Sequence, residues 1–182
     1  MTLRCRRSPV RICAKSYPVS NPSIVCDTTV LLYLSRIGHI DLLSALFDVV
    51  WVPDAVRLEL DMGRFLRRDT IDPRDLPWVT LAAVPQEMIG ALPPNRLGPG
   101  ERAVIAFALS QGSIAGLDDL QARRFAETLG LRVAGTLGLL LRAKQMGIVP
   151  AVRQLVDAAI AEGFHIGPAL YRDMLELAGE SP

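Results

Sequence analysis

The sequence predicts an α/β domain with a mostly parallel central sheet. Short apolar runs alternate along the chain with longer stretches in which apolar residues recur every three or four positions. The short runs are typical of buried strands, and the longer stretches are typical of helices. Strands that alternate with helices form a parallel sheet covered by helices. At 182 residues, 50% of them hydrophobic, the chain is long enough for one such domain with its own core.

Five apolar runs are the predicted strands, and each is bounded by residues that favour turns. The third of them suits an edge of the sheet, and the first and fourth suit adjacent central positions. The predicted strands are residues 24–26, 49–52, 78–84, 113–117 and 131–133.

Helices are predicted between and after these strands. Residues 30–47 carry leucines and isoleucines at three-residue steps, with an interruption at Gly38. Pro53 is expected to open a helix over about 54–61 that stops at Gly63, before a loop or irregular helix at 64–77. Glu101 is expected to start a helix over 102–110 that stops at Gly112, and Gly130 is expected to close a helix over 120–129. Thr136 is the expected N-cap of a helix that ends at 146. The last two predicted helices are 151–162 and 168–178.

Residues 1–22 carry five basic side chains and no acidic one. They lack the apolar core of a secretory signal and show no apolar periodicity. We therefore expect a disordered basic extension that is dispensable for folding, followed by one domain over residues 23–180. The extension is either an arm that touches nucleic acid, a plain tail, or the product of a misassigned start codon.

The composition argues against several classes of protein. Cys5, Cys13 and Cys26 form no C-x-x-C pair, and His39 and His165 lie far apart, so a structural zinc site is not expected. This cysteine usage fits a reduced, cytoplasmic setting. No apolar run approaches the ~18 residues that a membrane span requires. With a net charge of +1, any site for a polyanion must be a local patch.

Acidic side chains follow two of the predicted strands. Asp27 comes directly after the first strand, and Asp118 and Asp119 come directly after the fourth. In a parallel sheet the functional crevice lies beyond the carboxyl ends of the strands. Glu101 stands in the first turn of a helix, and Glu59 lies in the helix that follows the second strand. Each acid also has a purely structural explanation, as a helix cap, as a first-turn residue favoured by the helix dipole, or as part of a solvated helix face.

Carboxylates that converge on one sheet edge repel each other and raise one another's pKa unless a cation neutralises them. Oxygen ligands select hard ions, so the expected cofactor is Mg²⁺ or Mn²⁺ rather than zinc. If these acids meet, the sequence predicts a divalent metal site at the carboxyl edge of the sheet.

Several short motifs follow one another in order from about residue 24 to residue 180. Together they make the chain similar to a PIN-domain family of predicted nucleic-acid-binding proteins, whose members are often toxin components of toxin–antitoxin pairs. The motifs are Asp27-Thr28-Thr29, Val52-Pro53-Asp54-Ala55-Val56 followed by Glu59, Leu97-Gly98-Pro99-Gly100-Glu101, Leu117-Asp118-Asp119 with Ala122-Arg123-Arg124, Gly135-Thr136-Leu137-Gly138, Ala143-Lys144, Gly147-Ile148-Val149-Pro150 and Gly163-Phe164.

The resemblance implies a PIN-like three-layer α/β/α domain with metal-dependent endoribonuclease activity on single-stranded or structured RNA. The family's acidic positions fall on Asp27, Glu59, Glu101 and Asp118, with Asp119 beside the last, and all five are candidate catalytic residues. The metal ligands would be Asp27, Glu101, Asp118 and Asp119, with Asp27 and Asp118 holding the first ion. Glu101 or Glu59 would orient the attacking water or a second ion. PIN toxins usually carry an aspartate where this chain has Glu101, so this side chain has a longer reach.

Threonines and arginines near these acids are candidate substrate contacts. Thr28 or Thr29 would hydrogen-bond to the metal shell, and Arg123 or Arg124 would grip a phosphate. The alternative for the arginines is a solvated helix face with pairing to a glutamate one turn later. Thr136 is either a helix cap or a further phosphate contact.

The expected partners are RNA, a cognate antitoxin protein and a second copy of the chain, with no membrane association. Leu170, Met174 and Leu177 form an apolar stripe on the last predicted helix. Such a stripe is either a partner surface or packs on the domain's own core.

Two other functions fit parts of the pattern. A phosphoryl-accepting receiver domain also gathers acids at strand ends, but it needs a lysine after a late strand, and Lys144 lies a full helix beyond the fifth predicted strand. A PIN-like module that binds RNA or a partner without cleaving is the second alternative. The nuclease interpretation requires the carboxylates of Asp27, Glu101 and Asp118 to lie close enough to share ions.

Overall fold

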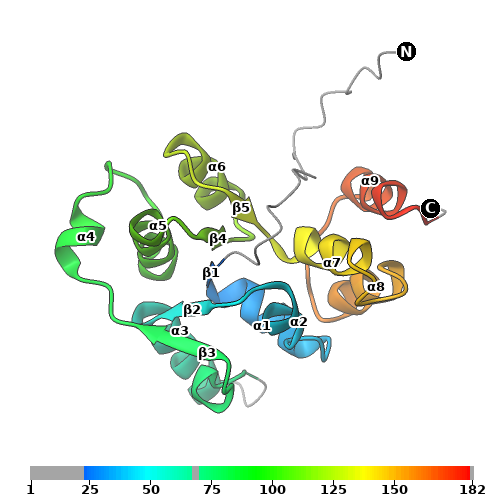
Figure 1. Ribbon diagram of the computed structural model, residues 1–182, viewed down its shortest axis with the longest axis horizontal. Helices are drawn as coiled ribbons and strands as arrows, with labels where there is room; N and C mark the ends of the chain where they lie inside the picture. The colour runs from blue at the N-terminus through cyan, green and yellow to red at the C-terminus, as the bar shows by residue number, and fades with distance from the viewer. Residues whose placement is uncertain (1–22, 67–69, 181–182) are drawn as a thin grey trace.

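The computed structural model describes residues 23–66 and 70–180 of the chain (Figure 1). Within these residues a single five-stranded sheet has the strand order β3-β2-β1-β4-β5, and every pairing in it is parallel. The predicted α/β class is therefore confirmed. The strands are β1 (Ile24–Cys26), β2 (Val50–Pro53), β3 (Val79–Ala82), β4 (Ile114–Gly116) and β5 (Val133–Ala134).

Helices connect the strands and continue after the last one. All the described connections between strands are helical, as parallel strands require. The helices are α1 (Thr28–Arg36), α2 (Leu42–Leu46), α3 (Asp54–Leu66), the 3₁₀ turn η1 (Pro73–Asp75), α4 (Gln86–Gly90), α5 (Pro99–Gln111), α6 (Leu120–Thr128), α7 (Thr136–Gln145), α8 (Arg153–Ala161) and α9 (Pro168–Ala178).

The sheet lies between two layers of helices, which gives the predicted three-layer α/β/α architecture. α5 packs against β1, β2 and β4, and α7 contacts α1, α2 and α9. Figure 1 shows α5 and α6 on one side of the sheet and α1, α2, α7 and α8 on the other. Because both faces are covered, all residues of β1 and β4 are buried, as expected for central parallel strands.

β1 and β4 are neighbours at the centre of the sheet, as the sequence predicted. Cys26 pairs with Gly116, and the N–H of Asp27 donates to the Gly116 carbonyl at 2.9 Å. Gly116 suits this close pairing, since a Cβ there would crowd the Val25 carbonyl oxygen at 3.1 Å. The chain leaves β1 toward β2, whereas β4 lies on the other side, so a switch point opens at the carboxyl end of β1.

α3 is longer than predicted, because Gly63 lies inside the helix rather than ending it. A glycine in a helix interior costs about 1 kcal/mol relative to alanine. Here Arg57 and Arg64 both form ion pairs with Asp61 along the last turns of the helix. The missing side chain also leaves room for Thr70, whose Cγ2 would lie 3.2 Å from a Cβ at Gly63.

The remaining differences concern helix starts. α4 was not predicted, because it has only five residues, of which Met88 and Ile89 pack against the core without being fully buried. α5 begins at Pro99, before the expected start, since Gly98 rather than a later residue is its N-cap. The prediction that Thr136 caps α7 is wrong: the N-cap is Gly135, and Thr136 is the first residue of the helix.

The C-terminal stripe packs mostly on the domain itself. Met174 is 0% exposed and belongs to the core, Leu170 packs against that core, and α9 contacts α7. Leu177 is the exception, with 48% of its surface exposed. The prediction that Met174 belongs to a partner surface is therefore wrong. The alternative, that this side chain packs on the domain's own core, is confirmed.

The predicted basic extension, residues 1–22, lies outside the described residues. Among the residues that are described, none of the helices combines the length and the apolar character needed to cross a bilayer.

Candidate active site

Asp27 is the buried acid at the carboxyl end of β1. It stands at the N-cap position of α1 and is only 4% exposed. Burial raises the pKa of this carboxyl to about 7, and the carboxylates of Glu59 and Glu101 contribute to the rise, whereas the N–H groups of Thr28 and Thr29 lower it. None of the arginine and lysine side chains in the described residues forms an ion pair with Asp27.

Glu59 joins the start of α1 to the start of α5. Its Oε2 accepts a hydrogen bond from the Thr28 hydroxyl at 2.5 Å, and its Oε1 accepts one from the Gly100 N–H at 2.9 Å. A Cβ at Gly100 would lie 2.5 Å from Oε1, so only glycine allows this approach. Glu59 is therefore a partly buried bridge rather than part of a solvated helix face.

Glu101 has a structural role and also lies among the other acids. Its Oε2 accepts the N–H of Gly98 at 2.9 Å, which completes the capping box of α5. Burial raises the pKa of this half-buried carboxyl, and the charges of Asp119 and Glu59 add to the rise, whereas the Gly98 N–H lowers it. The dipole of α5 and the neighbouring acids thus act on Glu101 in opposite directions.

Asp118 is turned toward the first residue of α7. Its Oδ1 accepts the N–H of Thr136 at 2.8 Å, and its Oδ2 accepts the Thr136 hydroxyl at 2.6 Å. Burial raises the pKa of Asp118, whereas these two hydrogen bonds and the charge of Arg123 lower it. A Cβ at Gly135 would lie 2.6 Å from Oδ1, so glycine is required beside this acid. Thr136 is fully buried, and in this structure its hydroxyl holds Asp118 in place.

The two arginines of α6 differ in position. Arg123 is half-buried, and its Nη1 reaches the Leu117 carbonyl oxygen at 3.4 Å, next to Asp118. This arginine faces the sheet edge and does not extend along a solvated helix face. Arg124 is exposed.

Asp119 caps α6. One oxygen, Oδ1, accepts the N–H groups of Gln121 and Ala122 at 2.8 Å each. The capping explanation considered for this residue is therefore confirmed. Asp119 remains exposed, and its charge still acts on Glu101.

Four of the five candidate acids form two groups at one edge of the sheet, and the fifth, Asp119, acts on the first group through Glu101. Asp27, Glu59 and Glu101 act on one another electrostatically, and we call these three the acidic site. Asp118 lies on the adjacent strand end, with its oxygens turned to Thr136. Within residues 23–66 and 70–180, no three histidine, cysteine, aspartate or glutamate side chains stand close enough together to hold a metal ion. A single ion shared by Asp27 and Asp118 therefore stays a prediction.

The chemistry of the donors still suits a hard dication. The acidic site and Asp118 offer only oxygen ligands, which favour Mg²⁺ or Mn²⁺. The pKa values of Asp27, Glu101 and Asp118 are all raised, so the charged forms of these groups are disfavoured in the folded chain. A divalent cation would reverse this penalty.

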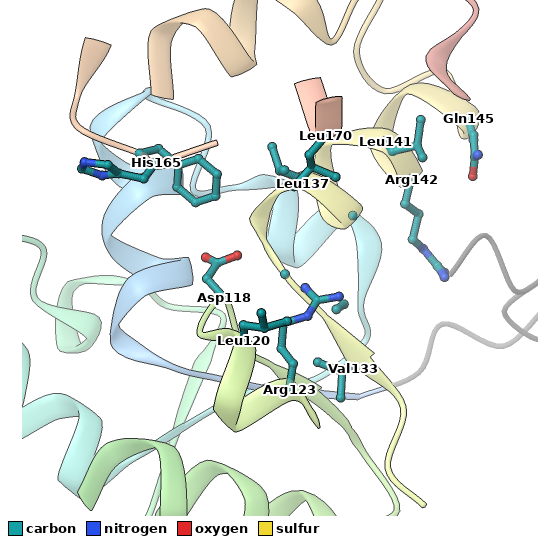
Figure 2. Close-up of a pocket in the computed structure, with 14 residues that line it drawn as sticks. Asp118, Leu120, Arg123, Val133, Leu137, Leu141, Arg142, Gln145, His165 and Leu170 are labelled. Carbon is teal, nitrogen blue, oxygen red and sulfur yellow. The ribbon is translucent and has the colours of Figure 1, made fainter. Parts of the chain in front are cut away.

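A pocket of about 200 Å³ adjoins Asp118 (Figure 2). Its lining comes from the ends of β4 and β5, from α6 and α7, and from the segment that leads into α9. Sequence reasoning missed this pocket, because its residues come from separate segments and share no periodicity. The Gly135-Thr136-Leu137-Gly138 motif was the one signal that pointed to it.

Comparison with known proteins supports the fold. A family model described as PIN domain matches residues 23–180, which is most of the chain. No curated protein matches the sequence.

Proposed function

The chain belongs to the PIN-domain family, a nuclease-type fold, and from this premise we propose that it is a metal-dependent endoribonuclease. The proposed cofactor is Mg²⁺ or Mn²⁺, and the proposed substrate is single-stranded or structured RNA. The candidate catalytic residues are those expected from the sequence: Asp27, Glu59, Glu101, Asp118 and Asp119.

One observation supports this proposal most strongly: Asp27 is a buried carboxyl whose pKa is raised by burial and by the charges of Glu59 and Glu101, and none of the described arginines and lysines forms an ion pair with it. A buried charge that is not compensated destabilises a protein. Such an arrangement is typical of functional sites, where a ligand supplies the missing charge.

Each residue then has a definite task. Asp27, Glu101, Asp118 and Asp119 would hold the metal, with Thr136 positioning Asp118 through two hydrogen bonds. Glu59 would fix the starts of α1 and α5 relative to each other through Thr28 and Gly100. A bound dication would lower the pKa of a water molecule and polarise the scissile phosphate.

The arginines of α6 would bind the substrate backbone. Arg123 lies beside Asp118, where its guanidinium can form hydrogen bonds with a phosphate that flanks the scissile one. Arg124 is exposed on the same helix and would contact a phosphate further along the strand.

The test is cleavage of a labelled single-stranded RNA by the full-length protein with Mg²⁺ or Mn²⁺, beside an EDTA control. We expect Asp27→Asn to lower the rate by on the order of 100-fold or more, because each carboxylate around a hard dication is needed. The matched control is Asp48→Asn, since Asp48 is exposed and precedes β2, at the opposite end of the sheet. Cleavage that survives EDTA, or equal rates in Asp27→Asn and wild type, would contradict the proposal.

Calorimetric titration with Mn²⁺ gives a readout that does not depend on RNA. Wild type and Asp48→Asn should bind the ion, and Asp27→Asn should bind it at least about tenfold more weakly. Equal binding by all three proteins would remove Asp27 from the metal site.

A toxin role is a further part of the proposal. Expression of the wild-type chain alone should then arrest bacterial growth, expression of Asp27→Asn should not, and a cognate antitoxin should restore growth. The proposed setting is the cytoplasm, where RNA substrates are present. Growth that is unaffected by the wild-type chain would leave a nuclease without a toxin role.

The second candidate function is a PIN-like module that binds RNA or a partner without cleaving it. The hydrogen bonds of Asp118, Asp119 and Glu101 favour it, because each of these carboxylates already accepts hydrogen bonds from groups of the chain. RNA binding that is equal in EDTA and Mn²⁺, with no cleavage in either, would support this module.

A further inference from the structure

The pocket beside Asp118 is built mostly by apolar side chains. Leu137 and Leu141 line it from α7, Val133 from β5, and Phe164 and Leu170 from the segment around the start of α9. The polar side chains that also line it are Asp118, Arg123, Arg142, Gln145 and His165. In Figure 2 the Asp118 carboxylate and the Arg123 side chain lie across from Leu137 and Leu170, and the His165 ring points away from them. The pocket therefore combines an apolar interior with a few polar groups, as ligand sites do.

The volume limits what can enter. A cavity of about 150 Å³ with apolar walls holds one benzene ring. At about 200 Å³, this pocket has room for one heterocyclic ring system but not for a helix or a peptide segment.

The position of the pocket connects it to the acids. Asp118 and Arg123 both line the pocket, and Nη1 of Arg123 donates to the Leu117 carbonyl oxygen at 3.4 Å. A nucleotide whose phosphate lies near Asp118 and Arg123 would therefore carry its base into the pocket. Phe164 offers an aromatic surface for stacking, which contributes about 1–3 kcal/mol per base in other single-strand binders. The Gln145 amide offers both a donor and an acceptor for a base edge.

The wall that carries Phe164 is fixed in place. The Tyr33 hydroxyl donates to the Gly163 carbonyl at 3.0 Å, and the Tyr33 and Phe164 rings meet edge to face with centroids 4.9 Å apart. Tyr33 belongs to α1, the helix that begins directly after Asp27. A preformed wall lowers the entropic cost of binding a flat ligand.

We propose that this pocket binds one nucleobase of the RNA, adjacent to the phosphate that is cleaved, and so sets the base preference of the enzyme. This inference rests on the proposed function for its substrate class. The pocket itself can nevertheless be tested without any cleavage.

Gly138 provides a way to fill the pocket. It lines the pocket from α7, and a Cβ at this position would meet no atom within 4 Å. Gly138→Leu should therefore fold, and it should fold at least as well as wild type, because glycine is a poor residue in a helix. The matched control is Gly90→Leu: Gly90 ends α4, has equally open space beside it, and is not among the residues that line the pocket.

The binding experiment uses the full-length protein in EDTA, with the four nucleoside 5′-monophosphates and ribose 5-phosphate as probes in calorimetric or NMR titrations. We expect at least one nucleotide to bind at least tenfold more tightly than ribose 5-phosphate. Gly138→Leu should lower the affinity for that nucleotide at least tenfold, and Gly90→Leu should leave the affinity unchanged. Equal binding of ribose 5-phosphate, or nucleotide binding that Gly138→Leu does not alter, would overturn the proposal.

Cleavage separates this proposal from the proposed function. If cleavage of a random-sequence RNA needs Mn²⁺ and Asp27, but its sites and rates are the same in Gly138→Leu, the nuclease stands and the base pocket is wrong. If no cleavage occurs, but base-dependent binding is lost in Gly138→Leu, the pocket stands and the nuclease is wrong.

Discussion

Helix α3 carries carboxylates that face two different regions of the molecule. Toward α1 and α5, Glu59 accepts hydrogen bonds from neutral groups, the Thr28 hydroxyl and the Gly100 N–H. Toward η1, Asp61 forms ion pairs with Arg57, Arg64 and Arg74. Asp72 lies beside it and pairs with Arg64 and Arg74. We call Asp61, Arg64, Asp72 and Arg74 the aspartate–arginine network.

The same residue types therefore behave in opposite ways. In the network, hydrogen bonds from Arg74 and Arg64 lower the pKa of Asp72, so its charge stabilises the fold. In the acidic site, burial and like charges raise the pKa of Asp27, so its charge destabilises the fold. In the network the aspartates pair with arginines of the chain, whereas none of the described arginines and lysines forms an ion pair with Asp27. This difference supports a ligand-binding role for the acidic site and a structural role for the network.

The largest expected effect comes from neutralising Asp27. In EDTA above pH 7, Asp27→Asn should raise the free energy of unfolding by up to about 4 kcal/mol. This is the free energy that corresponds to the rise in the pKa of Asp27 from 3.8 to about 7 on folding. The sign follows from proton binding: between about pH 4 and pH 7 the folded protein keeps a proton that the unfolded chain has lost. The free energy of unfolding of the wild type therefore decreases as the pH rises through this window. The variant should not show this decrease.

Urea unfolding at pH 4, 6 and 8 measures this difference. The variant and wild type should agree at pH 4 and separate toward pH 8, with the exposed control Asp48→Asn following wild type throughout. Added Mn²⁺ should stabilise wild type at pH 8 but not Asp27→Asn. Parallel pH curves for wild type and Asp27→Asn would mean that the charge of Asp27 is already compensated.

A smaller and opposite effect is expected at Glu180. Its Oε1 accepts the Lys144 ammonium at 2.5 Å and the Val152 N–H at 2.6 Å, and its Oε2 accepts the Arg153 N–H at 2.9 Å. These donors lower the pKa of Glu180 to about 2, although partial burial opposes them. Glu180→Gln should lower the free energy of unfolding at pH 7 by about 2 kcal/mol, because it removes a charged acceptor that ties the end of α9 to α7 and α8.

The pH dependence of this loss is the reverse of that at Asp27. The stabilisation by Glu180 is present above about pH 4.5 and disappears as the pH falls toward 2. Thermal melts at pH 7 and pH 2.5 should therefore show a large difference only at pH 7. Glu176→Gln, on the exposed face of the same helix, is the control. An equal loss in Glu176→Gln would point to the helix as a whole rather than to the Glu180 contacts.

The fold could be predicted from the sequence because its strands are short apolar runs that are buried on both sides. β1 and β4 were predicted at nearly their observed bounds, since the residues that follow them are acids and turn-formers. The prediction was less successful where tertiary contacts decide the outcome. α3 runs through Gly63 beside the ion pairs of its last turns, and α4 has only five residues, too few for a periodic pattern to reveal it.

The site could be predicted only in part, for a related reason. Parallel topology places strand ends together, so the shared sheet edge of Asp27 and Asp118 follows from the order of elements. The partners of the side chains do not follow from it. Glu59 meets Thr28, and Asp118 meets Thr136, only because the helices that carry them pack as they do. The arginines that pair with Asp72 were likewise not predicted, since the sequence of 64–77 shows only an irregular charged segment.

The smallest expected effect tests that network. Asp72 accepts hydrogen bonds from Arg64 at 2.6 Å and from the Arg74 side chain at 2.7 Å, and its Oδ1 caps η1 through the Arg74 N–H at 2.9 Å. Asp72→Asn keeps the cap but removes the charge, so it should lower the free energy of unfolding at pH 7 by about 1 kcal/mol.

The loss should shrink in about 1 M salt, which screens such pairs. It should also shrink as the pH falls below about 4 and disappear as the pH approaches the lowered pKa of Asp72, because the difference in pKa between the folded and unfolded chain stabilises the fold only above that range. Urea unfolding at low and high salt measures it, with Asp75→Asn, an exposed acid of the same turn, as control. If Asp72→Asn instead raised the stability, as Asp27→Asn is expected to do, charge compensation within the chain would not be what separates the two regions.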